Sequence, residues 1–94
     1  MCGRGTDLRV AGLIAMARYH LHLFNDIDII DEEGRDFPDL PAAEVEAVRS
    51  ARDVIADHIL SGRPVCLHHR MEIADAGGTV LKVIAFQDVV RFEP

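Results

Sequence analysis

The stretch from Asp39 to Pro64, DLPAAEVEAVRSARDVIADHILSGRP, decides the fold. Between Leu40 and Ser61 apolar side chains recur at helical spacing, which predicts one amphipathic α-helix. The stripe that we expect to face the core consists of Val45, Val48, Ala51, Ile55 and Ile59. The polar side consists of Glu46, Arg49, Ser50, Asp53 and Asp57.

Both ends of this helix are marked. Asp39 can accept hydrogen bonds from the free N–H groups of a first turn, so we expect it to be the N-cap. Gly62 is the residue type that commonly ends a helix in the left-handed conformation, and Pro64 prevents continuation. His58 falls on the apolar side of the helix, where a buried imidazole needs a hydrogen-bond partner.

A strand pattern precedes the helix. Residues 19–24, YHLHLF, alternate in a way that predicts Tyr19, Leu21 and Leu23 on the core face. His20, His22 and Phe24 then share the other face. Residues 27–30 are expected to pair back on this strand, with residues 31–34, DEEG, as the following turn. Residues 37–39, Phe-Pro-Asp, are expected to leave the sheet, because Pro38 cannot donate to a ladder.

A second hairpin follows the helix. Residues 70–74 and 79–86 read as extended runs joined by residues 75–78, which include two glycines. The inward face of the last run is ambiguous because the run is nearly all apolar. The charge on Lys82 favours an interpretation in which Val80, Ile84 and Phe86 lie on the wetter side.

The predicted order is β-β-α-β-β, an α+β fold in which one amphipathic helix packs on one face of a small, mainly antiparallel sheet. One apolar stripe covers one face only, so the other is open to solvent or to a dimer partner. We expect residues 16–94 to form this single domain. Residues 1–15 are interpreted as a non-structural N-terminal extension or a mis-annotated start, because the strand pattern begins just after Met16.

Composition restricts the partners. The 94 residues carry a net charge of −6, which repels phosphate backbones and anionic lipid surfaces, so neither nucleic acid nor membrane is expected as a partner. Two cysteines, Cys2 and Cys66, do not make a disulfide framework, which favours a reducing cytoplasm. The acidic residues concentrate in one segment, which fits either a solvated loop or a surface for a basic partner. They are Asp26, Asp28, Asp31, Glu32, Glu33, Asp36 and Asp39.

Histidines suggest a metal site as one hypothesis. His20 and His22 stand two apart on one strand, so their rings project to one side about 6 to 7 Å apart. Further ligands could come from Cys66, His68 or His69. The alternative is a histidine pair on a half-wet sheet face. No calcium loop or phosphate-binding loop is present in the sequence, and Cys66 has no orienting residue in the pattern, so neither cofactor nor catalytic residue is expected.

From Met16 onward the chain resembles a family of short uncharacterised bacterial proteins, a domain of unknown function whose members typically begin with a Met-x-Arg-Tyr strand. The resemblance rests on residues 16–19 with His22-Leu23, residues 31–34, Pro38-Asp39-Leu40, residues 50–53 and residues 73–75 leading to Gly78. It implies an organisation and a start at Met16, and it assigns no reaction. Other members more often carry an aromatic residue at the position of His20, which weakens the metal hypothesis.

A second similarity is to small antitoxin domains of the HicB type. These domains also place a Pro-Asp-Leu-Pro-like segment before a helix, here residues 37–41, FPDLP. The Gly-Cys and Thr-x-x-Glu-Ala elements of those domains are missing here. The similarity is therefore an analogy, which implies a regulatory module as one alternative function.

The leading hypothesis is a non-enzymatic cytoplasmic domain that acts through protein contacts, either as a homodimer or with another small protein. The expected partner surface consists of His20, His22, Phe24, Asp28, Asp31, Glu32 and Glu33. The alternatives are an antitoxin-like module that binds a basic partner protein, and a histidine-based metal-binding protein.

Overall fold

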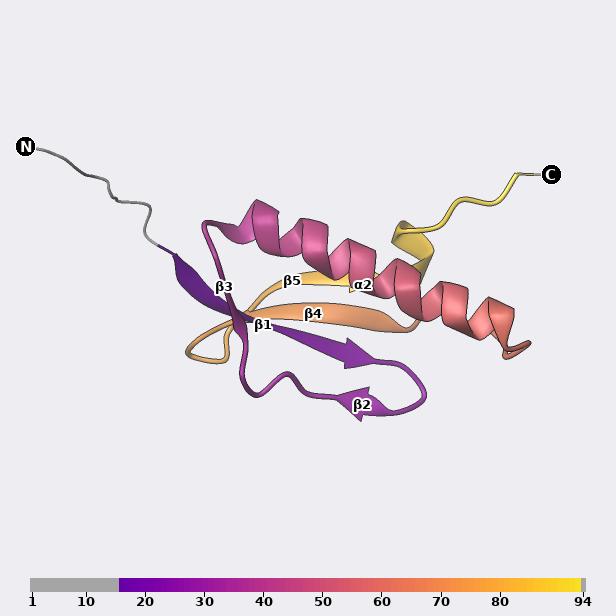
Figure 1. Cartoon of the computed structure of the whole chain (residues 1–94), viewed down its shortest axis with the longest axis horizontal. Helices are drawn as coiled ribbons and strands as arrows, with labels where there is room; N and C mark the ends of the chain where they lie inside the picture. Colours follow the sequence, from indigo (N-terminus) through magenta and orange to yellow (C-terminus); the bar gives the residue numbers. More distant parts are fainter. Residues whose placement is uncertain (1–15, 94) are drawn as a thin grey trace, which may run out of the picture.

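One long helix lies across one face of an antiparallel sheet (Figure 1). A computed structural model describes residues 16–93, and the interpretations placed on residues 1–15 lie outside them. The elements in chain order are β1 (Ala17–Phe24), β2 (Asp28–Ile29), β3 (Arg35–Phe37), α2 (Leu40–Leu60), β4 (Arg70–Asp75), β5 (Val80–Ala85) and the 3-10 turn η1 (Phe86–Asp88). The predicted α+β class is confirmed. In this part of the chain no helix is long and apolar enough to cross a bilayer.

The sheet is built around β1. Its order is β2-β1-β4-β5, with β3 pairing to the same edge of β1 as β2, and every pairing is antiparallel. The register sets Leu21 opposite Ile73 and Leu23 opposite Ile29. Strand β3 was not predicted: residues 35–37 pair with residues 17–19 before Pro38 ends the ladder, so Phe37 still belongs to the sheet.

Alanines make the contact between α2 and the sheet. Ala43, Ala47 and Ala51 are each 0% exposed, and Ile55 and His58 complete the buried face of the helix. The predicted stripe is wrong at two positions, because Val45 is 73% and Ile59 is 64% exposed. Small side chains let the helix backbone approach the sheet, so the contact is centred on the alanines and the larger aliphatic residues lie at its margin.

The predicted ends of the helix are confirmed. The side chain of Asp39 accepts a hydrogen bond from the N–H of Ala42 at 3.0 Å. Gly62 follows the C-cap residue Ser61 in the left-handed conformation, with φ of 75°. The N–H of Arg63 then donates to the carbonyl of His58 at 2.9 Å, which satisfies one of the free carbonyls of the last turn.

The last strand corrects the interpretation based on Lys82. Ile84 and Phe86 are buried, at 6% and 2% exposure, on the side covered by the helix. Lys82 shares that side, but its long side chain reaches the sheet margin, where Nζ lies 3.8 Å from Glu44 Oε2 of α2. The prediction is confirmed for Val80, which is 46% exposed. The register between β4 and β5 shifts by one residue between Ile73 and Ala74.

His58 is the one buried polar residue among the described core positions, at 5% exposure. Its Nδ1 lies 2.9 Å from the carbonyl of Val54, and its Nε2 lies 3.5 Å from Asp26 Oδ2. The imidazole therefore has two partners: a carbonyl of its own helix and Asp26 in the turn between β1 and β2. These contacts join the last turn of α2 to the sheet.

We predict that Ala47→Leu destabilises the protein by about 1 to 3 kcal/mol, because the added methylene groups would force α2 away from the sheet. Ala56→Leu, at an exposed position of the same helix, is the matched control and is expected to change stability by less than about 0.5 kcal/mol. Urea denaturation followed by circular dichroism measures both. Equal effects of the two substitutions would contradict the close alanine contact.

Candidate functional site

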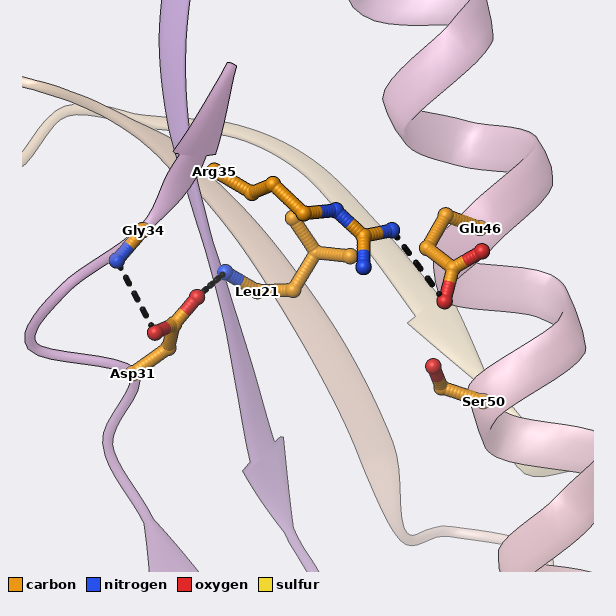
Figure 2. Close-up of a pocket in the computed structure, with 6 residues that line it drawn as sticks. All are labelled: Leu21, Asp31, Gly34, Arg35, Glu46 and Ser50. Carbon is orange, nitrogen blue, oxygen red and sulfur yellow. Dashed lines mark hydrogen bonds and ion pairs between the residues drawn. The ribbon is translucent and has the colours of Figure 1, made fainter. Parts of the chain in front are cut away.

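The loop between β2 and β3 is fixed to the edge of β1 by the carboxylate of Asp31. One oxygen accepts from the N–H of Leu21 at 3.1 Å and the other from the N–H of Gly34 at 3.0 Å (Figure 2). Gly34 has φ of 72°, and a Cβ there would lie 2.8 Å from the carbonyl oxygen of Tyr19. Only glycine therefore fits this close approach, and Asp31 satisfies a strand N–H that neither β2 nor β3 reaches.

The main chain of Asp31 is held by the two histidines of β1. Its carbonyl oxygen lies 2.8 Å from Nδ1 of His20, and its N–H donates to Nδ1 of His22 at 3.0 Å. Asp31 therefore contacts three consecutive positions of β1, using its carboxylate on Leu21 and its peptide groups on both neighbours. The predicted partner residue Asp31 is thus a structural anchor with both carboxylate oxygens occupied.

This environment also changes the titration of Asp31. Partial burial opposes ionisation, but the hydrogen bonds from Leu21 and Gly34, together with the nearby His20 and His22, outweigh it. The pKa of Asp31 is therefore held below its ordinary value of 3.8. The ionised carboxylate is the form that the folded loop requires.

A cavity of about 300 Å³ separates this loop from α2. Figure 2 shows its lining: Leu21, Asp31, Gly34 and Arg35 from the sheet side, and Glu46 and Ser50 from the helix. Arg35 Nη2 lies 3.2 Å from Glu46 Oε2. Hydrogen bonding from Arg49 lowers the pKa of Glu46 against the opposing effect of burial, and Arg35 adds to this lowering. Arg35 and Glu46 are thus paired with each other, and the carboxylate of Asp31 is bound by backbone N–H groups, so the cavity forms a junction between helix and sheet.

The predicted aromatic row lies on the face of the sheet opposite α2. The rings of His20 and His22 are stacked with centroids 6.2 Å apart, and Phe24 meets His22 edge-on at 6.3 Å. Arg70 of β4 lies over the ring of Phe24, 4.5 Å from its centroid, and also pairs with Glu72 at 2.8 Å. A shallow cavity of about 270 Å³ adjoins the two imidazoles and is also lined by Glu32 and the β4–β5 turn.

The other histidines of the metal hypothesis lie elsewhere. His69 precedes β4, packs edge-on against Phe86 at 5.9 Å, and its Nε2 lies 4.0 Å from Asp26 Oδ1. His20 pairs with Ala74, so His68 and His69 lie beyond the far end of β4, at least about 13 Å along the sheet. Residues 16–93 contain no group of three or more His, Cys, Asp or Glu side chains arranged to hold a metal ion.

The acidic segment divides into structural and exposed residues. Asp36 pairs with Arg18 at 3.0 Å, while Asp26, Asp31 and Asp39 make the contacts described above. Asp28, Glu32 and Glu33 remain exposed near the β2 edge of the sheet. These three are the acidic positions of the predicted partner surface that the fold leaves open.

Sequence reasoning found only part of the exposed apolar area of β5. Val80, Leu81 and Val83 are exposed at 46%, 40% and 49%, respectively, and only Val80 was predicted on the wetter side. A nearly continuous apolar run suggests a strand buried on both faces, so the exposure of Leu81 and Val83 was not apparent. Within residues 16–93, β4 is the only strand that pairs with β5, so β5 lies at an edge of the sheet.

We predict that Asp31→Asn lowers the free energy of unfolding by about 1 to 2 kcal/mol at neutral pH, because one amide N–H₂ would face a backbone donor. The lowered pKa means that the carboxylate stabilises the fold fully above pH 3.8 and loses this effect as the pH falls through the folded-state value. The difference between the two proteins should therefore shrink on acidification. Urea denaturation along a pH series measures it, with exposed Asp28→Asn as the control.

Comparison with known proteins gives one match. Residues 18–87 match the family model described as a domain of unknown function, DUF6894. No curated protein and no solved structure matches the chain. The match covers all but the first residue of β1 and the last residue of η1, so it includes the Asp31 loop, the histidine pair and the open face of the sheet. The chain belongs to the DUF6894 family.

Proposed function

We propose that this protein is a non-enzymatic, cytoplasmic protein-contact module that forms a homodimer by antiparallel pairing of β5 with β5 of a second copy. The observation that carries the proposal is the open edge of β5, six residues long, with three exposed apolar side chains. An unpaired strand edge presents free N–H and C=O groups to any chain that can pair with it. Antiparallel pairing of identical strands is compatible with two-fold symmetry.

The charge distribution favours a second copy as the partner. The single charged residue of β5 is Lys82, and its side chain is directed to Glu44 on the helix side. The exposed acidic residues Asp28 and Glu33 lie on the β2–β3 side of the sheet, whereas Glu44 and Asp88 lie beside β5 together with Lys82. Pairing through β5 would therefore keep Asp28 and Glu33 of the two copies apart, although each copy carries −6 overall.

Helix α2 adds apolar surface near the β5 edge of the sheet. The helix lies over β4, and Val48 on its flank towards β5 lines a groove of about 350 Å³ with Val83 and Val89. Val45 lies next to Val48 on the helix surface. A two-fold axis perpendicular to the sheet would put both helices on one face. At a strand spacing of about 4.8 Å their axes would then be about 14 Å apart, little more than the diameter of a helix with its side chains. Val45, at 73% exposure, would be shielded there.

The polar groups that line the cavity between the Asp31 loop and α2 support a role without catalysis. Both carboxylate oxygens of Asp31 are occupied by N–H groups, and Arg35 and Glu46 pair with each other. Cys66 is exposed and forms no disulfide within residues 16–93, which fits a reducing compartment. The antitoxin-like alternative would rely on the acidic surface, of which the fold leaves Asp28, Glu32 and Glu33 exposed.

We predict that the wild-type protein sediments and scatters light as a dimer and that Val83→Lys converts it to a folded monomer. A lysine on an edge strand opposes its pairing with a second strand, and in the dimer it would add one positive charge from each copy next to the seam. The measurement is size-exclusion chromatography with light scattering over a range of protein concentrations. Circular dichroism checks that the variant remains folded.

Ile29→Lys is the matched control, because Ile29 is a 55% exposed apolar residue on the opposite edge strand, β2. It is expected to leave the dimer intact. A wild-type protein that stays monomeric at high concentration would refute the proposal. So would a dimer that Ile29→Lys dissociates and Val83→Lys does not.

A further inference from the structure

The main chain of Asp31 makes opposite demands on the Nδ1 atoms of two neighbouring imidazoles. A carbonyl oxygen only accepts hydrogen bonds, so the contact at 2.8 Å requires a proton on Nδ1 of His20. A backbone N–H only donates, so the contact at 3.0 Å requires a bare Nδ1 on His22. Neutral His20 is therefore the Nδ1–H tautomer, and neutral His22 is the Nε2–H tautomer.

A second proton affects these two contacts differently. On His20 it binds at Nε2, and Nδ1–H continues to donate to the carbonyl of Asp31. On His22 it has to bind at Nδ1, where the N–H of Asp31 already donates. Two N–H groups cannot form a hydrogen bond with each other, so the imidazolium form of His22 and its contact with Asp31 exclude each other.

We propose that His22 is a proton-sensitive switch for the Asp31 loop: the neutral ring holds the N–H of Asp31, and protonation at Nδ1 releases it. Imidazoles take up their second proton between about pH 8 and pH 5. The contact is therefore present at the upper end of this range and is lost as the pH falls through the titration of His22.

The release is confined to one peptide group. The pKa of the Asp31 carboxyl lies below 3.8, so its carboxylate stays ionised throughout the range in which histidine titrates. It continues to accept from the N–H groups of Leu21 and Gly34. Acidification therefore frees the peptide between Ile30 and Asp31 and leaves the rest of the loop attached to β1.

Charged groups around the rings favour this proton uptake. The carboxylate of Asp31 attracts a positive charge on either imidazole, and Glu72 of β4, which pairs with Arg70 at 2.8 Å, lies opposite His22 in the sheet. A charge on His20 opposes a second one on His22, because the stacked rings are 6.2 Å apart. The remaining charged neighbours are Glu32 and Asp75 beside the adjoining cavity and Arg18, which pairs with Asp36. Carboxylates predominate, and one backbone N–H opposes the proton.

The experiment follows full-length ¹⁵N-labelled protein by NMR from about pH 8 to pH 5. Two-bond proton–nitrogen correlations at the upper pH should report the Nδ1–H tautomer for His20 and the Nε2–H tautomer for His22. The His22 ring and the Asp31 amide should then change with the same midpoint. The protection of the Asp31 amide against hydrogen exchange, relative to its intrinsic rate, should fall about tenfold, while the amides of Leu21 and Gly34 keep theirs.

Two variants separate the switch from the fold. His22→Asn offers an amide oxygen that accepts from the N–H of Asp31 at every pH, so the Asp31 amide should stay protected and the pH step should disappear. His20→Asn is the matched control: its side-chain N–H₂ can donate to the carbonyl of Asp31, and the pH step should remain. Circular dichroism checks that both variants are folded.

A proton on Nδ1 of His22 at the upper pH would overturn the inference. So would an Asp31 amide whose protection does not follow the titration of His22, or a pH step that persists in His22→Asn. If His22→Asn does not fold, the wild-type titration decides alone.

The switch does not depend on the proposed homodimer, because the Asp31 loop and β5 lie at opposite edges of the sheet. Val83→Lys should therefore retain the pH step. A wild-type monomer that shows the step would refute only the homodimer, whereas a dimer without it would refute only the switch.

Discussion

The contact on which this fold depends is the seating of three alanines, Ala43, Ala47 and Ala51, against the sheet. Because their side chains are short, α2 lies close to β4 and covers one face of the sheet with β1 and β5 on either side. Phe37, Ile73 and Phe86 fill the space around this contact. A single helix covers only one face of the sheet, so the opposite face remains open. The histidine row and the apolar side chains of β5 are exposed for that reason.

The open face is organised by one loop. Asp31 uses its carboxylate on the strand backbone and its peptide groups on His20 and His22, so a single residue connects the edge of β1 to both imidazoles. Burial would favour the neutral carboxyl, but the N–H groups of Leu21 and Gly34 prevail and keep its pKa low. One loop residue therefore links the strand backbone to the histidine row: the carboxylate of Asp31 holds the loop, and its peptide groups orient His20 and His22.

Much of the fold could be predicted from local chemistry. Asp39, Gly62 and the alternation of residues 19–24 each express a short-range rule, and the helix limits and the face of β1 follow from them. Tertiary packing decided the rest. The buried face of α2 is centred on the alanines, so Val45 and Ile59, which the pattern predicts to be buried, are exposed. Lys82 suggested the wrong inward face for β5, because its side chain reaches Glu44 at the margin of the sheet. For the site, the pattern placed His20, His22 and Phe24 together, but their link to Asp31 depends on a loop that returns to the same strand.

The two edges of the sheet are unequal in length. Strand β5 offers six residues, whereas the other edge is divided between β2, with two residues, and β3, with three, around the Asp31 loop. A chain that stacked head to tail would have to join the long edge of one copy to this interrupted edge of the next. In the proposed dimer the two long edges would pair with each other, and only the interrupted edges would remain for a further copy. The Asp31 loop would then oppose open-ended fibre formation.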